Sequence, residues 1–231
     1  MKILVVIPTY NERSNIAQIV TEIFKTDARV EILVVDDQSP DGTGEVVEAM
    51  RVNEKRLHLL SRKNKQGLGR AYLAGFSWGM AQGFDVLAEM DADFSHRPVD
   101  LPKLLRAMDT YDFVVGSRYI DGGKVANWSL LRKFISRGGS LYARLILGYP
   151  IRDWTGGFNV WRRKVLEAID MQTIQSEGYS FQIELKYRAL RKEFRYCEVP
   201  IVFEDRREGQ SKMSLKIVIE AFYRVWMIKF A

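Results

Sequence analysis

Residues 2–37, KILVVIPTYNERSNIAQIVTEIFKTDARVEILVVDD, contain two short apolar runs separated by a segment with a different period. The runs at 2–8 and 31–37 are rich in β-branched residues, which is typical of buried strands. Between them, apolar side chains recur at the spacing of one helix face: Ile16, Ile19, Val20 and Ile23. The stretch therefore predicts a strand, a helix and a second strand, which is the repeating unit of an α/β fold.

The same alternation continues to about residue 118, where the pattern changes. Before that point we expect further strands at 56–60, 84–91 and 111–117, and further helices at 41–52, 68–82 and 99–109. After it we expect a helix pair at 127–147 broken or kinked at Gly138-Gly139, a strand at 158–162, a helix at 178–191, a strand at 194–203 and a helix at 214–229. We predict a single α/β domain over residues 1–231, with a mostly parallel central sheet flanked by helices.

Acidic residues follow several of the predicted strands. Asp36 and Asp37 end the second strand, Asp91 and Asp93 follow the fourth, and Glu12 comes just after the first. The carboxyl ends of parallel strands meet at one edge of a sheet, where α/β proteins bind ligands, so these acids should share a crevice.

The D-x-D pattern of Asp91 and Asp93 predicts a divalent-cation site. If the strand continues through Asp93, the two carboxylates lie on one face and repel each other unless a cation lies between them. Carboxylate oxygens are the ligands that Mg²⁺ and Mn²⁺ prefer, with substrate phosphates completing the coordination. The alternative is a surface turn or cap before the next helix. For the nearby His96 we favour a positioning or stacking role over metal binding.

Charge and composition narrow the class of partner. The chain has 231 residues and a formal net charge of +6, which favours an acidic partner such as a nucleotide, a nucleic acid or an anionic membrane, or else a solvated basic surface. A single cysteine, Cys197, excludes an intramolecular disulfide. No uncharged apolar stretch reaches the ~18 residues that a membrane span requires.

Basic residues gather in one loop and on two amphipathic segments. The loop EDRREGQSKMS, residues 204–214, offers Arg206, Arg207 and Lys212, which suit a diphosphate or else form an exposed charged loop.

In the last helix, Lys212, Lys216, Glu220 and Arg224 recur every four residues and leave an apolar remainder of Leu215, Ile219, Phe222, Trp226 and Phe230. In residues 127–147, the apolar Trp128, Leu131, Phe134, Leu141 and Leu145 are interleaved with Arg132, Arg137 and Arg144. We interpret both segments as interfacial helices at a membrane surface, with ordinary core packing as the alternative. A nucleic-acid partner is disfavoured because the basic residues form no polar stripe.

These motifs resemble the family-2 glycosyltransferases of the polyprenol- or dolichol-phosphate mannose synthase type, over essentially the whole chain. The matching stretches are VVIPTYNE, VVDDQSPDGT, GLGRAYLAGF, EMDADFSHRP, VVGSRY, LLRKFISRGGSLYARLILG, DWTGGFNVW, GYSFQIEL and VPIVFEDRREGQSKMS. The resemblance implies a glycosyltransferase A fold, also called the nucleotide-diphospho-sugar transferase fold. Residues 1–118 would form the nucleotide-binding half, and residues 119–231 the acceptor and membrane-facing half with C-terminal amphipathic interfacial helices.

The resemblance also implies roles for particular residues. The nucleotide pocket would be formed by Pro8, Tyr10, Glu12, Val35, Asp37, Asp91, Ala92, Arg206 and Lys212. The metal would be bound by Asp91, Asp93 and Ser95, and the acceptor phosphate by Arg118, Arg132 and Ser136. The residues expected to carry catalysis are Asp91, Asp93, Arg118, Arg132, Arg206 and Lys212. Ser95 stands where some relatives have a glutamine ligand, and Asn159 where relatives often have an arginine.

The activity implied is inverting transfer of mannose from GDP-mannose to a polyprenyl or dolichyl monophosphate, with Mg²⁺ or Mn²⁺ as cofactor. The protein would act peripherally at the cytoplasmic face of a membrane, with a membrane-anchoring subunit as one conceivable partner and no nucleic acid. The absence of appended membrane spans resembles the short members of the group. The alternatives are a UDP-sugar-dependent polyprenyl-phosphate glycosyltransferase and a non-catalytic scaffold that binds nucleotide sugars.

Overall fold

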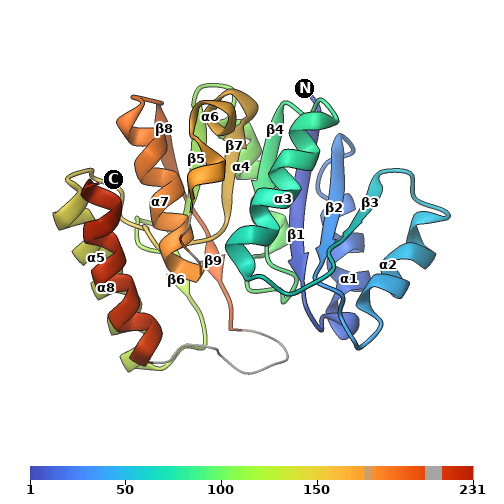
Figure 1. Cartoon of the computed structure of the whole chain (residues 1–231), viewed down its shortest axis with the longest axis horizontal. Coiled ribbons are helices and arrows are strands. Elements are labelled where there is room, and N and C mark those ends of the chain that lie inside the picture. Colours follow the sequence, from blue (N-terminus) through green and yellow to red (C-terminus); the bar gives the residue numbers. More distant parts are fainter. Residues whose placement is uncertain (175, 177, 206–214, 231) are drawn as a thin grey trace.

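A seven-stranded sheet runs through the middle of the protein, with helices on both faces (Figure 1). The computed structural model describes residues 1–174, 176, 178–205 and 215–230. The sheet contains β1 (Ile3–Thr9), β2 (Val30–Asp36), β3 (Leu57–Ser61), β4 (Val86–Glu89), β5 (Phe113–Ser117), β7 (Asn159–Arg162) and β8 (Tyr196–Pro200). Its order is β3-β2-β1-β4-β7-β5-β8, and β6 (Lys124–Val125) pairs separately with β9 (Val202–Phe203). These features confirm the predicted α/β class with a mostly parallel central sheet.

The helices divide between the two faces of the sheet. They are α1 (Arg13–Phe24), α2 (Thr43–Arg51), α3 (Leu68–Ala81), α4 (Leu101–Ala107), α5 (Leu130–Leu147), α6 (Arg163–Ala168), α7 (Gly178–Arg191) and α8 (Leu215–Phe230), with 3₁₀ turns η1 (Pro98–Asp100) and η2 (Met171–Thr173). In Figure 1, α3, α7 and α8 lie in front of the sheet, while α1 and α2 lie behind it.

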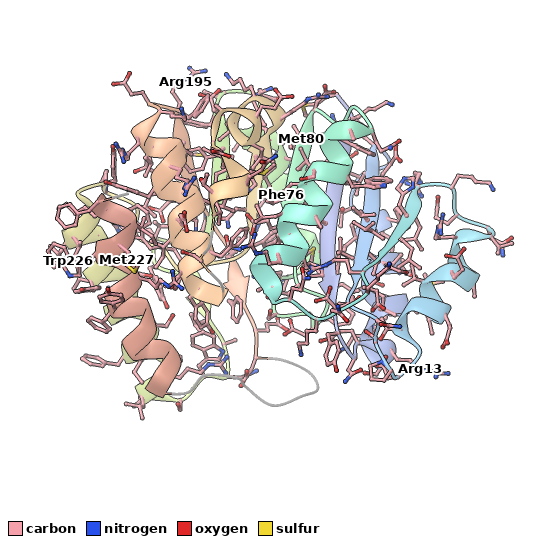
Figure 2. The ribbon with its side chains drawn as sticks, viewed as in Figure 1. Arg13, Phe76, Met80, Arg195, Trp226 and Met227 are labelled. Carbon is pink, nitrogen blue, oxygen red and sulfur yellow. The ribbon has the colours of Figure 1, made fainter. Side chains whose placement is uncertain are left out.

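Alternation along the strands builds one core on each face. Ile3 and Val5 of β1 pack in the core that contains Ile16 of α1, whereas Leu4 and Val6 pack in the core that contains Phe76 of α3. Successive side chains of a strand point to opposite faces, so a strand buried on both sides is apolar throughout. Figure 2 shows Phe76 and Met80 on α3 against the sheet, and Trp226 and Met227 at the outer edge of the molecule on α8.

One strand of the sheet runs against the others. β7 pairs antiparallel with both β4 and β5, while β1, β2, β3 and β4 are parallel to one another, as are β5 and β8. Asn159, Val160 and Trp161 are completely buried. An apolar run buried on both faces has the same sequence pattern in either direction, so the expected strand at 158–162 was located correctly but its direction was open.

The expected break at Gly138-Gly139 is wrong. α5 is one continuous helix, capped at its start by the Ser129 hydroxyl, which accepts the backbone N–H of Arg132 at 3.3 Å, and ended by Gly148 with φ of 80°. An added Cβ on either Gly138 or Gly139 would meet nothing within 4 Å. Two glycines weaken a helix without requiring a kink when its capping and packing are in place.

Helices α5 and α8 pack side by side and run in the same direction. The rings of Tyr142 and Phe222 lie 4.3 Å apart, and further along both helices the Lys229 ammonium donates to the carbonyl of Ile146 at 2.5 Å. Within the described part of the chain, no helix is long and apolar enough to cross a membrane.

Candidate active site

A cavity of about 360 Å³ opens at the carboxyl ends of the parallel strands, between the two halves of the sheet. The strand order reverses there: β2 and β3 lie on one side of β1, and β4, β7, β5 and β8 lie on the other. Such a switch point is the usual ligand site of an open α/β sheet. Several of the predicted site residues line the cavity: Pro8, Tyr10, Glu12, Asp37, Asp91, Ala92, Asp93, Ser95, Arg118 and Arg132.

The loops after three of these strands have unusual backbone conformations. Asn11 after β1, Gln38 after β2 and Phe94 after β4 have φ of 63°, 53° and 63°. Left-handed backbone is uncommon for residues other than glycine and is most costly for a bulky one such as phenylalanine. The three turns hold the strand ends in a fixed arrangement around the cavity.

The strand does not continue through the D-x-D segment, so the two carboxylates do not lie on one strand face, and the chain bends there as in the alternative. β4 ends at Glu89, and the chain bends between Ala92 and Ser95 because Phe94 is left-handed. Asp91 and Asp93 nevertheless line the same cavity. The buried Tyr72 of α3 donates its hydroxyl proton to Asp91 Oδ1 at 3.2 Å, and the backbone N–H of Ser95 donates to Asp93 Oδ1 at 3.1 Å. Burial and the nearby Asp91 carboxylate raise the pKa of Tyr72 well above its ordinary value, so the phenol stays a donor.

His96 fixes the backbone of the same segment. Its ring is 1% exposed, stacks on Phe158 at 5.0 Å and meets Phe203 edge-on at 5.4 Å. The Nδ1 atom accepts the backbone N–H of Asp91 at 3.1 Å, which requires an unprotonated nitrogen. Burial lowers the pKa of His96, in agreement with a neutral ring. These contacts match the stacking and positioning role expected for His96.

The residues at the D-x-D turn fit a divalent cation. Asp91 and Asp93 offer carboxylate oxygens, and the hydroxyl oxygen of Ser95 is buried without a hydrogen-bond partner among the described residues. An orphaned buried oxygen beside two carboxylates suits a ligand or a bound water. No cluster of three or more acidic, histidine or cysteine side chains for a metal occurs in the described ranges. Two carboxylates are what a Mg²⁺-type site shared with substrate phosphates needs.

On the side of the cavity formed by the ends of β1 and β2, Asp37 contributes a buried carboxylate. Arg62 Nε lies 3.3 Å from Asp37 Oδ1, but the geometry is not that of a hydrogen bond, and Oδ1 has no hydrogen-bond partner within the described residues. Burial raises the pKa of Asp37, although Arg62 opposes this effect. Lys65 lies 3.6 Å from the centre of the Tyr10 ring, and both line the cavity. This side offers an acceptor oxygen and an aromatic face, which suit a nucleoside.

On the side of the cavity that follows β5, Arg118 is held by a buried acid. Its Nε and Nη2 donate to the two oxygens of Asp153, each at 2.7 Å, and Nη2 also donates to Thr155 Oγ1 at 2.8 Å. Burial would lower the pKa of Arg118, but Asp153 raises it above its ordinary value, so the side chain is always charged. Arg118 still lines the cavity, and its Nη1 makes no hydrogen bond to a described residue.

Arg132 comes from α5 and also reaches the cavity. Its Nη1 donates to Asp205 Oδ1 at 2.8 Å, and the guanidinium lies 3.9 Å from the Trp128 ring centre. The Nε atom is buried and has no hydrogen-bond partner in the part of the chain that the structure describes. Trp128 is therefore a buried support for Arg132, and its predicted place on a membrane-facing surface is wrong.

Other predicted site residues lie outside the cavity lining. Val35 is fully buried in the core under α3, and Ser136 accepts a hydrogen bond from the Tyr119 hydroxyl at 2.7 Å. Neither residue lines the cavity. Arg206 and Lys212 fall outside the described residues, so their predicted roles at the diphosphate stay predictions.

A buried polar network beneath the cavity was missed in the sequence. Glu89 accepts hydrogen bonds from Trp161 Nε1 at 2.6 Å and from the Gln182 amide, and Gln182 lines the cavity. Asn159 donates to Gln182 Oε1 at 2.8 Å. Burial raises the pKa of Glu89 to about 7, against the opposing effect of these donors. The only signal in the sequence was a charged residue inside the apolar run VLAEM, where a buried partner is required.

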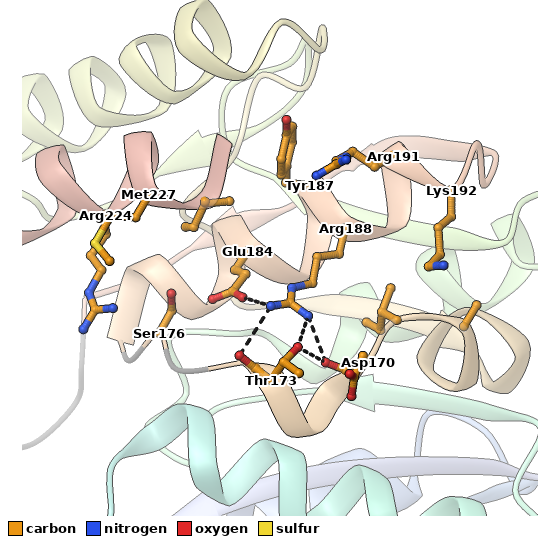
Figure 3. Close-up of a pocket in the computed structure, with 13 residues that line it drawn as sticks. Asp170, Thr173, Ser176, Glu184, Tyr187, Arg188, Arg191, Lys192, Arg224 and Met227 are labelled. Carbon is orange, nitrogen blue, oxygen red and sulfur yellow. Dashed lines mark hydrogen bonds and ion pairs between the residues drawn. The ribbon is translucent and has the colours of Figure 1, made fainter. Parts of the chain in front are cut away.

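A second cavity of about 660 Å³ lies between η2, α7 and α8 (Figure 3). One of the cations that line it, Arg188, donates to the carbonyl of Asp170 at 2.9 Å, to the Thr173 hydroxyl at 2.6 Å and to the Glu184 carboxylate. Arg188 therefore ties α7 to η2, and its guanidinium is occupied by these structural contacts.

The sequence and the fold agree on the class of protein. The family described as glycosyl transferase family 2 matches residues 4–170, and the chain belongs to this family. It is 47% identical over 225 residues to the undecaprenyl-phosphate mannosyltransferase of Micrococcus luteus, covering 97% of this chain and 93% of that protein. It is also 47% identical over 230 residues to the polyprenol monophosphomannose synthase of Mycolicibacterium smegmatis, covering 98% of this chain and 87% of that protein. These matches confirm the resemblance drawn from the motifs.

Solved structures with low sequence identity share the fold. The glucosyl-3-phosphoglycerate synthase of Mycobacterium tuberculosis, solved with Mn²⁺ and UDP, has a TM-score of 0.66 at 19% identity and covers 98% of this chain and 78% of its own. The mannosyltransferase PcManGT of Pyrobaculum calidifontis, solved with GDP-Man and Mn²⁺, has a TM-score of 0.60 at 16% identity, and the match covers 98% of this chain and 73% of that chain. The glycosyltransferase A fold is thereby confirmed.

Proposed function

We propose that this protein transfers mannose from GDP-mannose to a polyprenyl monophosphate, and so acts as a polyprenyl-phosphate β-D-mannosyltransferase. The observation that carries the proposal is the 47% identity, over nearly the full chain, to two proteins named for mannosyl transfer to polyprenyl phosphates. The cavity supports it, because acidic residues on one side and Arg118 and Arg132 on the other suit a metal-bound nucleotide sugar facing an anionic acceptor.

The nucleotide would bind along the ends of β1 and β2. Tyr10 offers an aromatic face, and the Asp37 carboxylate, whose Oδ1 is in an ion pair with Arg62 but accepts no hydrogen bond from a described residue, can accept an N–H of the base or a ribose hydroxyl. Asp91, Asp93 and Ser95 would hold Mg²⁺ or Mn²⁺. When bound, the cation would neutralise negative charge on the diphosphate leaving group. The roles of Arg206 and Lys212 in holding the same diphosphate are part of this proposal.

The acceptor phosphate would bind between Arg118 and Arg132. Both arginines line the cavity, and each has a nitrogen that makes no hydrogen bond to a described residue: Nη1 in Arg118, and the buried Nε in Arg132. Guanidinium groups recognise phosphate oxygens well, and the opposing acids Asp153 and Asp205 keep both side chains oriented before the ligand arrives. Ser136 faces Tyr119, so we leave it out of this site.

The reaction needs positioning more than proton transfer. A phosphate oxygen of the acceptor forms a bond to C1 of mannose, and the bond from C1 to the diphosphate oxygen breaks with its electron pair leaving on GDP. A phosphate monoester with a second pKa near ~6 is largely dianionic at neutral pH, so no strong general base is required. Arg118 and Arg132 would screen the repulsion between two anionic substrates. Attack opposite the leaving group would convert the α-mannoside of the donor into a β-mannosyl phospholipid.

A membrane surface is the proposed location of the acceptor. Leu130, Leu131, Phe134, Leu141 and Leu145 of α5 are exposed, as are Phe222, Tyr223, Trp226, Met227 and Phe230 of α8. Because α5 and α8 pack side by side, these side chains form one large apolar area, next to the exposed Arg137 and Arg144. Large apolar areas rimmed by basic residues are typical of proteins that bind anionic bilayers peripherally.

A GDP-release assay tests the catalytic proposal. It compares GDP-mannose with UDP-glucose, with and without a short polyprenyl phosphate, in Mg²⁺, in Mn²⁺ and in EDTA. We expect release from GDP-mannose only when both lipid phosphate and metal are present. Release only from UDP-glucose would keep the reaction and replace the sugar, whereas donor binding without release would favour the scaffold alternative. In the same assay, Asp93→Ala should lower transfer by on the order of 10²–10³-fold, with an unchanged thermal unfolding profile.

Vesicle flotation tests the membrane proposal. Phe134→Ser removes one exposed apolar side chain from α5 and should reduce flotation with anionic vesicles. Val52→Ser is the matched control, because Val52 is 70% exposed after α2, in the nucleotide-binding half. Equal flotation of the wild type and Phe134→Ser would argue against α5 as a contact surface.

A further inference from the structure

Residues 152–157, which follow α5 and precede β7, are held from three sides, and we call them the clamped loop. On the β8 side, Glu198 accepts the backbone N–H groups of Arg152 and Asp153 at 2.8 and 3.0 Å. On the β5 side, the Asp153 carboxylate accepts the backbone N–H and the guanidinium of Arg118. Within the loop, the N–H of Gly156 donates to Asp153 Oδ1 at 2.9 Å.

The third contact is a buried ammonium group from α7. Lys186 is 0% exposed, and its Nζ donates to the carbonyl oxygens of Asp153, Trp154 and Gly156 at 3.3, 3.0 and 2.7 Å. Three carbonyls turned toward one point leave a concentration of partial negative charge that needs a cation. Lys186 supplies the cation from within the chain, and the number of its acceptors equals the number of its protons.

The position of the loop decides where two cavity residues lie. Asp153 fixes the plane of the Arg118 guanidinium through two hydrogen bonds, and Thr155 both accepts from Arg118 and lines the cavity. Gly157 lines the cavity as well. A shift of the clamped loop would therefore move Arg118 and the cavity wall at Thr155 and Gly157 together. None of the hydrogen bonds described above joins the clamped loop to the loops after β1 and β2.

Burying a charged lysine in the core lowers the stability of the folded state. Burial of an unpaired ammonium costs several kcal/mol, and an apolar side chain of similar volume is often better for stability. Burial lowers the pKa of Lys186 to about 8, although the carboxylates of Asp153 and Glu89 oppose this effect. A role in fixing the conformation of the clamped loop would account for a buried ammonium at this free-energy cost.

We propose that Lys186 is a positioning residue: it holds the clamped loop, and through the loop it places Arg118 and Thr155 to receive the acceptor phosphate. The inference rests on the proposed function. Among the described residues, the hydrogen bonds of the Lys186 ammonium all go to the clamped loop, so we expect its loss to affect acceptor binding more than donor binding.

The test is Lys186→Met, which keeps a long unbranched side chain and removes the ammonium. Steady-state transfer should show a KM for a short polyprenyl phosphate raised at least tenfold, while the Kd for GDP-mannose, measured by calorimetry, changes less than twofold. A merely structural role would instead lower activity through the fraction of folded protein and leave both constants unchanged. Lys192→Met, an exposed lysine just beyond the end of α7, is the matched control and should behave as wild type.

A second variant keeps the proposal testable if Lys186→Met does not fold. Glu198→Gln replaces one of the two acceptor oxygens that hold the loop from the half-buried β8 side, so it loosens the loop without emptying the core. It should raise the same KM by a smaller factor, with donor affinity unchanged. An unchanged acceptor KM in the folded variants, or an equal loss of donor affinity, would overturn the role of Lys186. An inactive wild type would instead overturn the proposed function, and the role of Lys186 with it.

Discussion

The two sides of the cavity are built by different physical means. The proposed nucleotide side is formed by the ends of β1, β2 and β4, which are parallel strands. Its candidate side chains come directly after these strands. The proposed acceptor side depends on buried charges. The Arg and Lys side chains that are buried within the described residues, Arg118 and Lys186, both contact the clamped loop. A site made from regular elements is tolerant of single polar changes, whereas one made from a charge network depends on every member.

The largest expected effect is that of Asp153→Asn. The change leaves the buried Arg118 guanidinium without its counter-charge, and breaking a buried ion pair in this way costs about 3–5 kcal/mol of unfolding free energy. Asp36→Asn is the nucleotide-side counterpart, because Asp36 is buried and accepts from Thr9 and Ser39 without a buried cation. Its cost should be about 1–3 kcal/mol. Urea unfolding of both variants measures the difference, and equal costs would remove the contrast between the two sides.

The difference between wild type and Asp153→Asn should shrink in acid. Burial would raise the pKa of Asp153, but Arg118, Lys186 and the backbone donors outweigh it and hold the pKa below its ordinary value of 3.8. A group with a depressed folded-state pKa contributes its stability above the unfolded pKa and loses it as pH falls through the folded value. Urea midpoints for the two proteins from pH 6 downward should therefore converge only below 3.8. Convergence at higher pH would mean that Arg118 does not hold the carboxylate ionised.

The sequence predicted the two sides of the cavity to different extents. The strands at the nucleotide side and the acids at their ends were located correctly, because period and turn residues report directly on local structure. The acceptor side depends on contacts between distant positions, such as Lys186 with residues 153–156 and Arg118 with Asp153. Periodicity carries no information on such pairs, and an isolated lysine in a helix is usually solvated.

Wrong predictions also had local causes. We expected a strand at 84–91 and considered its continuation through Asp93, yet β4 ends at Glu89 and the left-handed Phe94 turns the chain, a conformation that propensities do not favour for phenylalanine. Trp128 was placed on an exposed face by helical spacing, but it lies before the start of α5 and packs under Arg132.

A smaller effect is expected from Gly75→Ala, which tests packing on the nucleotide side. A Cβ at this position of α3 would fall well inside contact distance of Val6 Cγ1 and lie 3.1 Å from Val35 Cγ2. Overpacking a strand–helix contact of this kind costs about 1–3 kcal/mol. Denaturant unfolding should show a lower midpoint with an unchanged slope. A neutral result would mean that α3 moves away from the sheet without cost.

The smallest effect should have the opposite sign. Gly138→Ala lies in the middle of α5, where an added methyl group meets nothing within 4 Å. The substitution should stabilise the protein by about 0.5–1 kcal/mol, because alanine loses less conformational entropy in a helix than glycine does. A raised urea midpoint confirms it. Destabilisation would show that residue 138 needs a backbone conformation other than the continuous helix.

The antiparallel β7 has a consequence for how the chain is made. The strands β3, β2, β1 and β4 are complete once residue 89 has been synthesised, but β4 then presents an unpaired edge with Glu89 on it. That edge is covered only when Asn159–Arg162 has left the ribosome and has inserted between β4 and β5. Unpaired strand edges can pair with other chains and cause aggregation. A nascent domain is open to such aggregation until its last central strand has been synthesised. We therefore expect chains halted between residues 89 and 162 to be the form of this protein that most needs a chaperone.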